Sequence, residues 1–119
     1  MNARTLEADT ATACAIIDRE TPGWIESAVT HAWDASLADA EARGMSSAMP
    51  DYLATSATNA AEEAARDAMD AAYILGHWTL RGTGDYTEAG NPDAAADRGL
   101  VVVYGAAYVA ALRNIRSNL

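Results

Sequence analysis

Alanine makes up about a quarter of this chain, and no other feature restricts its fold so strongly. Alanine is the best helix former, and here it occurs in long runs together with Glu, Arg, Met and Leu. Glycine and proline interrupt those runs at a few points, which mark helix ends. The sequence therefore predicts an all-α fold: a compact bundle of four to five helices, with a glycine-rich loop before the last, most buried helix.

Length and composition indicate one domain. A chain of 119 residues can bury about two thirds of the surface that its unfolded form exposes, so residues 1–119 are expected to form a single helical domain. The hydrophobic fraction is 50%, but alanine supplies about half of it and buries little area per side chain. The core must therefore depend on the three tryptophans, the five tyrosines and the larger aliphatic side chains.

The N-terminal part of the chain predicts two helices that are separated at a proline. The first runs from about Thr5 to Arg19 and ends at Thr21-Pro22-Gly23. Thr21 is suited to cap the second helix, because Pro22 is tolerated at a first helical position, where its missing N–H would have no partner. Gly44 is then the glycine that ends this second helix.

A long third helix is expected from Pro50 to His77 or Leu80. Its inward side follows a near-heptad spacing and consists mostly of alanine. The residues expected on that side are Leu53, Ala57, Ala60, Ala64, Ala68, Ala71 and Leu75. Such a seam of small side chains lets a partner helix approach closely. The partner is either another helix of the same chain or a second copy, which would make a homodimer through residues 53–75.

The last helix is expected to follow a glycine-rich loop at residues 81–91. Asn91 can cap this helix, and Pro92 suits its first position. From Leu100 to Ile115 the helix is apolar on nearly every side, so it is expected in the middle of the bundle, covered by its neighbours. A buried strand over residues 101–104 is the alternative, because a short apolar run does not distinguish the two structures.

The sequence lacks the motifs of enzymes and metal centres. A carboxylate-bridged metal site in a bundle needs a glutamate three residues before each histidine, and neither His31 nor His77 has one. Cys14 is the only cysteine, so it allows no intramolecular disulfide, and it is expected to pack as a small hydrophobe. Motifs for nucleophilic catalysis or phosphate binding are also missing. We expect a protein that is not an enzyme and has no cofactor, no metal and no catalytic residue.

The charge of the chain excludes some partners. Seventeen acids stand against eight arginines and no lysine, which gives a formal net charge of −9. Direct nucleic-acid binding needs a basic surface and is therefore not expected. No membrane segment is expected either, because the longest apolar stretch, Leu100–Leu112, is shorter than the roughly 20 residues that cross a bilayer. The N-terminus resembles no secretory signal, which predicts a cytoplasmic protein.

Seven acids are the candidate partner-binding residues. They are Glu62, Glu63, Asp67 and Asp70 on the expected third helix, and Asp34, Asp39 and Glu41 on the second. Glu63, Asp67 and Asp70 share one helix face, where neighbouring like charges cost about 0.2–0.5 kcal/mol per pair. Arg66 offsets part of this cost if it pairs with Glu62 and Asp70. A partner-binding surface would explain these neighbouring acids on the third helix. A solvated helix face that only keeps the protein soluble would explain them equally well.

In size, charge and lack of catalytic motifs, the chain resembles the small inhibitors that phages use against bacterial defences, among them anti-CRISPR proteins and DNA mimics. The resemblance covers composition and length and assigns no residue roles. It implies an inhibitor that binds a protein with a basic surface, such as a nucleoprotein complex in the host cytoplasm, with charge steering the two together. The aromatic residues that could anchor such a contact are Trp24, Trp33, Trp78 and Tyr86.

Two other interpretations fit the same composition. One is a structural or assembly module that self-associates through the alanine seam and uses its charge for solubility. The other is adaptation to high salt, which would suit a chain with abundant aspartate and no lysine. A GC-rich genome explains the use of arginine in place of lysine equally well.

Overall fold

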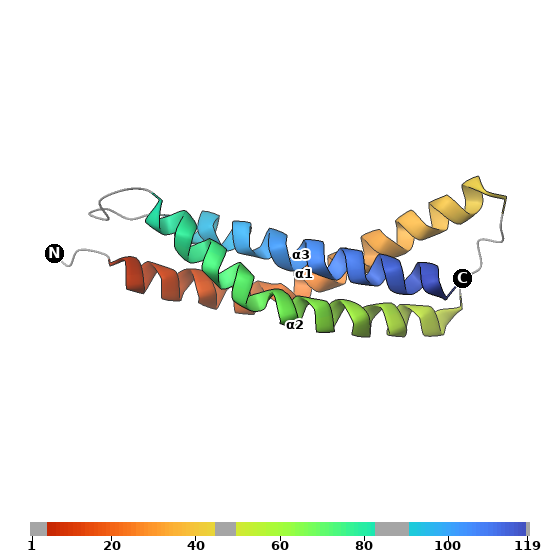
Figure 1. Ribbon diagram of the computed structural model, residues 1–119, viewed down its shortest axis with the longest axis horizontal. Coiled ribbons are helices and arrows are strands. Elements are labelled where there is room, and N and C mark those ends of the chain that lie inside the picture. Colours follow the sequence, from red (N-terminus) through yellow and green to blue (C-terminus); the bar gives the residue numbers. More distant parts are fainter. Residues whose placement is uncertain (1–4, 45–49, 83–90, 119) are drawn as a thin grey trace.

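The computed structural model describes residues 5–44, 50–82 and 91–118 and places them in three long helices. These are α1 (Leu6–Ala42), α2 (Asp51–Arg81) and α3 (Pro92–Ser117), which run up, down and up along a molecule of 63 × 22 × 18 Å (Figure 1). The all-α prediction is confirmed: the three described stretches contain no strand, and residues 101–104 belong to α3. The predicted number of four to five helices is wrong. Most of the loop predicted at residues 81–91 lies outside the described stretches.

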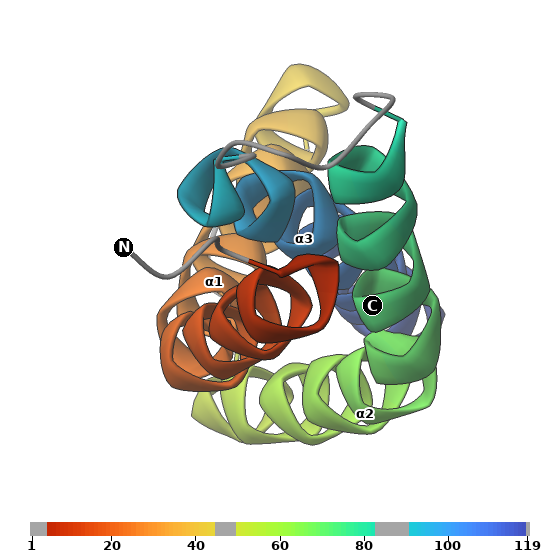
Figure 2. The same cartoon turned by 90° about the vertical axis from the view of Figure 1, so that its left-hand side faces the viewer.

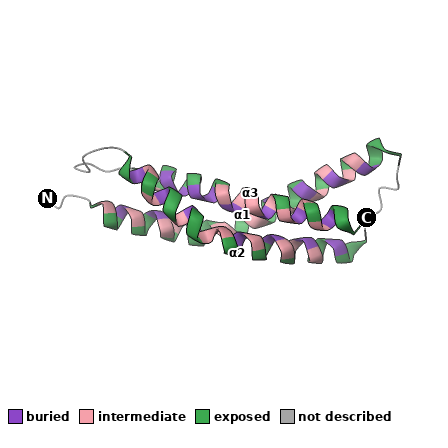
Figure 3. Cartoon of the chain, in the orientation of Figure 1, coloured by how far each residue is buried: buried purple, intermediate pink, exposed green. Residues whose placement is uncertain are grey.

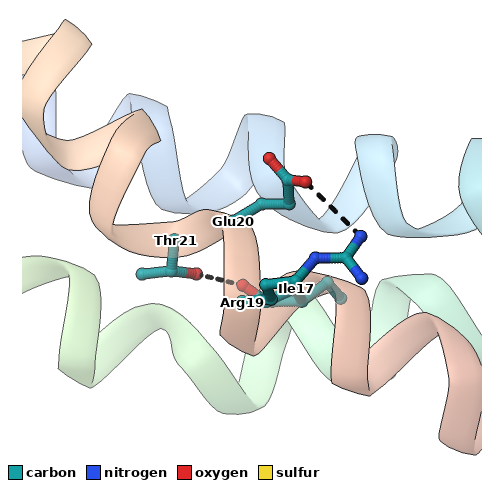
Figure 4. Close-up of polar contacts among 4 residues, drawn as sticks. All are labelled: Ile17, Arg19, Glu20 and Thr21. Atoms are coloured by element: carbon teal, nitrogen blue, oxygen red, sulfur yellow. Dashed lines mark hydrogen bonds and ion pairs between the residues drawn. The ribbon is translucent and has the colours of Figure 1, made fainter.

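α1 passes through Pro22, where the sequence predicted that one helix ends and another begins. The hydroxyl of Thr21 does not cap a new helix; it donates a 2.6 Å hydrogen bond back to the carbonyl oxygen of Ile17 (Figure 4). Proline lacks the N–H that would reach the carbonyl of Asp18, and its ring crowds that carbonyl, so the helix bends here (Figure 1). A proline inside a helix costs about 3 kcal/mol. Packing of both halves of α1 against the rest of the bundle offsets this cost.

Three other predicted helix ends are confirmed by their capping residues. Thr5 Oγ1 accepts a 3.0 Å hydrogen bond from the N–H of Ala8 at the start of α1. At the start of α3, Asn91 Oδ1 accepts a 3.1 Å hydrogen bond from the N–H of Ala94. Gly44 follows the end of α1 with a φ of +71°, the left-handed conformation that glycine adopts most readily.

Buried side chains recur every four residues in all three helices and face the neighbouring helices (Figure 3). The stripes are Ala28, Ala32, Ser36 and Ala40 in α1, Leu53, Ala57, Ala61 and Ala65 followed by Ala72, Gly76 and Leu80 in α2, and Ala95, Gly99, Val103, Ala107, Ala111 and Ile115 in α3. Four residues advance about 40° beyond one helical turn, so each stripe winds around its helix and the ridges of one helix fit between those of the next. Because most of these residues are alanine, the backbones approach closely.

The inward stripe predicted for α2 is correct at its beginning, where Leu53 and Ala57 are buried. The later members are half-buried or exposed: Ala60, Ala64, Ala68, Ala71 and Leu75. Ala61, Ala65 and Ala72 are buried in their place, because the stripe follows a four-residue step rather than a heptad. The buried part of the alanine seam therefore packs inside the monomer.

α3 contacts both α1 and α2, as expected for the last helix. It is not covered on every side, because two neighbours leave part of a helix open: Val101 is 59% exposed and Val109 is 43% exposed. Within the described stretches, α3 is also the one helix that is long and apolar enough to cross a membrane, by length and composition. A core helix of a bundle passes the same test, and the buried residues of α3 belong to the hydrophobic core.

The three helices approach one another closely at two glycines. A Cβ atom on Gly99 of α3 would lie 2.7 Å from the carbonyl oxygen of Ala72 and 2.7 Å from Cδ1 of Ile17. On Gly76 of α2, a Cβ atom would lie 3.7 Å from the same Ile17 atom. Ile17 is fully buried, so α1 inserts this side chain where neither neighbouring helix has one.

Candidate partner-binding surfaces

The seven acids predicted as binding residues lie on two helices, and six of them are exposed. α2 carries Glu62, Glu63, Asp67 and Asp70, and α1 carries Asp34, Asp39 and Glu41. Asp39 is half-buried, and its Oδ2 lies 3.4 Å from Nε of Arg43 on the next turn.

The acids of α2 form an exposed row. Glu63, Asp67 and Asp70 lie on the face of this helix opposite its buried alanines, with Glu62 at the edge of that face. Arg66 forms no ion pair or hydrogen bond with any described residue, so the pairing predicted with Glu62 and Asp70 is not formed. These four acids and one arginine leave a net charge of −3 on nine consecutive residues.

The acids of α1 do not join this row. The part of α1 after the bend diverges from the first half of α2, and at that end of the molecule α3 lies between them (Figure 1 and Figure 2). The seven predicted residues therefore form two groups, one on α1 and one on α2, rather than one continuous patch.

Both histidines bind residues on another helix rather than neighbours on their own. His31 Nδ1 lies 2.6 Å from the hydroxyl of Tyr104, which ties α1 to α3. His77 Nδ1 lies 3.1 Å from the hydroxyl of Thr10, which ties α2 to α1. In the part of the chain that the structure describes, no three His, Cys, Asp or Glu side chains converge as metal ligands.

A third polar contact between helices involves Tyr73 of α2, whose hydroxyl donates a hydrogen bond to the carboxylate of Asp18 on α1. This hydrogen bond, together with burial and the negative charge of Asp18, raises the pKa of Tyr73 to about 12. Cys14 is half-buried near the same carboxylate, and burial followed by the charge of Asp18 raises the pKa of its thiol. A raised pKa lowers the population of the thiolate, which is the nucleophilic form of the side chain.

A cavity of about 410 Å³ opens between α1 and α3, and we call it the aromatic recess. Its lining consists of Glu20, Gly23, Trp24, Ser27 and His31 of α1 and Tyr104 of α3. The ring of Tyr104 lies 6.3 Å from that of Trp24, with the planes 82° apart, and 5.8 Å from that of His31. On α1, Glu20, Trp24, Ser27 and His31 recur at four, three and four residues, a spacing that could have identified this face from the sequence.

α2 ends in an exposed apolar group of Ile74, Leu75 and Trp78, whose exposed fractions are 56%, 37% and 56%. The guanidinium of Arg81 lies 5.0 Å from the ring centroid of Trp78. Of the aromatic anchors predicted from the sequence, Trp78 is the exposed one, Trp24 and Trp33 are half-buried, and Tyr86 lies outside the described residues.

Comparison with protein families, curated proteins and solved structures finds no match for this chain. The molecule is thus defined by its own features: a three-helix bundle with a bent first helix, two exposed acidic groups, an aromatic recess and an apolar end of α2. Its function is inferred from these surfaces.

Proposed function

We propose that this protein is a non-enzymatic, acidic interaction protein that inhibits a nucleic-acid-binding partner by occupying the partner's basic surface. In this proposal the carboxylates of Glu63, Asp67 and Asp70 contact that surface in place of phosphates. A phage protein directed against a bacterial defence, of the anti-CRISPR or DNA-mimic kind, would act in this way. The partner would be a protein or nucleoprotein complex in the host cytoplasm.

The observation that carries the proposal is the exposed, unneutralised row on α2. Like charges at these spacings weaken a helix, so stability alone gives no reason for the row. Arg66 stands within it but pairs with no described residue. The formal net charge of −9 would also speed encounter with a basic partner and make the complex sensitive to salt.

Two triple variants of equal charge test the proposal. They are E63K/D67K/D70K on α2 and D34K/D39K/E41K on α1. Each changes the formal net charge from −9 to −3, so the pair separates the position of the acids from their total charge. The tagged wild-type protein is used to capture proteins from a nuclease-treated lysate of the host cell at low salt.

We expect the wild-type protein to retain a basic, nucleic-acid-binding protein that high salt and added duplex DNA both release. The α2 variant should lose this protein, and the α1 variant should keep it. Equal retention by the two variants would reject the α2 row as the contact surface. If added duplex DNA does not release the captured protein, the proposed competition with nucleic acid is rejected.

Self-association into a structural or assembly module is the second candidate, and the exposed Ile74, Leu75 and Trp78 favour it. Leu75 belongs both to the predicted alanine seam at residues 53–75 and to this exposed group, so a homodimer would form through the exposed part of the seam and this end of α2. Sedimentation equilibrium of the wild type and of Trp78→Ser tests this function. A dimer that the substitution converts to a monomer supports the assembly module, and a wild type that stays monomeric rejects it.

A further inference from the structure

The aromatic recess has the chemistry of a site for an organic cation. We propose that it binds the guanidinium group of an arginine on a protein partner. A guanidinium stacks on aromatic faces and pairs with a carboxylate through two parallel hydrogen bonds. Trp24 and Tyr104 contribute aromatic rings to the lining of the recess, and Glu20 contributes a carboxylate.

The rings of the recess are held in place before any ligand binds. Trp24 and Tyr104 have planes 82° apart, so they form two walls that meet nearly at a right angle. His31 lies 2.6 Å from the hydroxyl of Tyr104 and fixes the position of that ring. Tyr108 stacks against Tyr104 with the planes 11° apart and their centroids 6.0 Å apart. A planar cation therefore meets rigid walls and loses little affinity to reorganisation.

The carboxylate of Glu20 is available to an incoming cation. Its partner in the chain is the neighbouring Arg19, with Nη2 of Arg19 3.5 Å from Oε1 of Glu20 and side chains that are 71% and 47% exposed (Figure 4). Exposed pairs of this kind contribute little to stability, so another arginine can replace Arg19. α1 carries eight acids against one arginine, a net charge of −7, which attracts cations to this side of the molecule.

Gly23 gives the recess an open side. Apart from its chain neighbours and the backbone of its own helix turn, no heavy atom lies within 4 Å of the position that a Cβ atom on Gly23 would occupy. Gly23→Leu therefore places a side chain in the recess without disturbing the core, and leucine favours the helix more than glycine does. This variant blocks the site and should still fold.

The test is a titration with N-acetyl-arginine methylamide, followed by the indole N–H NMR signals of the three tryptophans. We expect the Trp24 signal to shift while those of Trp33 and Trp78 do not, and the matching lysine compound to bind more weakly. Gly23→Leu should abolish the shift. Glu20→Gln should weaken binding about 1.5- to fivefold, the effect of one exposed charge pair. Glu26→Gln, another exposed glutamate of α1 outside the recess, should leave binding unchanged.

Three results would overturn the inference. The first is a shift at Trp78 without one at Trp24, and the second is an equal effect of Glu20→Gln and Glu26→Gln on binding. The third is equal binding of the arginine and lysine compounds. A short peptide with one arginine and agmatine, a free guanidinium amine, distinguish the source of the cation. Tighter binding of the peptide supports a protein partner, and tighter binding of agmatine contradicts it. Only one part of this inference rests on the proposed function: that the arginine belongs to a protein partner. E63K/D67K/D70K should not alter the titration. The guanidinium site and the binding role of the α2 acids can therefore fail separately.

Discussion

Gly99 and Gly76 are both buried helical glycines, yet the space around them differs. In Gly99→Ala the new Cβ would lie 2.7 Å from a backbone carbonyl that cannot move by itself, so we expect the free energy of unfolding to fall by about 1–3 kcal/mol. In Gly76→Ala the contacts are 3.7 Å, and the better helix propensity of alanine should raise that free energy by about 0.5–1 kcal/mol. Urea denaturation followed by circular dichroism measures both. Changes of the same sign would contradict the close approach of the helices at Gly99.

Tyr73 makes a pH-dependent contribution to stability at high pH. Its pKa in the folded protein is about 12, above the ordinary value of 10.0, because Asp18 accepts its proton in a hydrogen bond. The folded state therefore holds this proton more strongly than the unfolded state, and the contribution is complete below about pH 10 and lost as the pH rises through about 12. We expect a late step in the tyrosinate absorbance that Tyr73→Phe removes and Asp18→Asn moves toward pH 10. A late step that persists in Tyr73→Phe would assign it to another tyrosine.

The role of a single residue was predictable from the sequence where its interaction partners are near it in the chain. The caps at Gly44 and Asn91 depend on a few residues on either side, so local patterns identify them. The contact between His31 and Tyr104 joins residues 73 positions apart and exists because α1 docks on α3 in one register. No local pattern specifies that register, which is why the sequence predicted the caps but not the aromatic recess.

At the scale of elements, the buried stripe of α1 from Ala28 to Ala40 contains one polar residue, Ser36. Ser36 is 2% exposed, and its hydroxyl has no hydrogen-bond partner among the described residues, whereas Ala28, Ala32 and Ala40 on the same stripe are apolar. Removing a buried unsatisfied hydroxyl recovers its desolvation cost, so Ser36→Ala should raise the free energy of unfolding by about 1 kcal/mol. Ala32→Ser, which adds a hydroxyl to the same stripe, should lower it by about 1–3 kcal/mol. Thermal and urea unfolding measure both changes, and a stabilising Ala32→Ser would contradict the packing of this stripe.

The errors about elements also have physical causes. Pro22 has every local mark of a helix start, and long-range packing on both sides of it keeps α1 continuous. In α2, alanines occur as adjacent pairs at 60–61, 64–65 and 71–72, so two inward stripes fit the sequence equally well. Gly76 and Leu80 lie on the stripe that the fold uses. A sequence this rich in alanine specifies helices firmly and their relative rotation weakly.

Over the whole molecule, the charge is divided unequally among the helices. α1 has a net charge of −7 and α2 of −3, whereas α3, which packs against both, has two acids and three arginines and a net charge of +1. Repulsion between the acidic helices opposes the compact state and is screened by salt, over about 10 Å at 0.1 M. The charge is thus a cost to the fold that increasing salt should reduce. Folding that requires molar salt would instead support adaptation to a saline environment.

Asp67 lies at the centre of the α2 row, with Glu63 four residues before it and Asp70 three residues after it. Asp67→Lys replaces two repulsions by two attractions, so at low salt the free energy of unfolding should rise by about 0.8–2 kcal/mol. Asp34→Lys changes the net charge equally but has no acid three or four residues away, so its gain should be smaller. Urea denaturation at 20 mM and 1 M NaCl should show the difference between the variants shrinking with salt. Equal gains in the two variants would attribute the stabilisation to net charge.

Binding of the captured partner by Asp67→Lys then tests the role of the row. If this variant is more stable and still binds the partner, the row has no role in binding. If binding falls as stability rises, the row is kept for function at the expense of the fold.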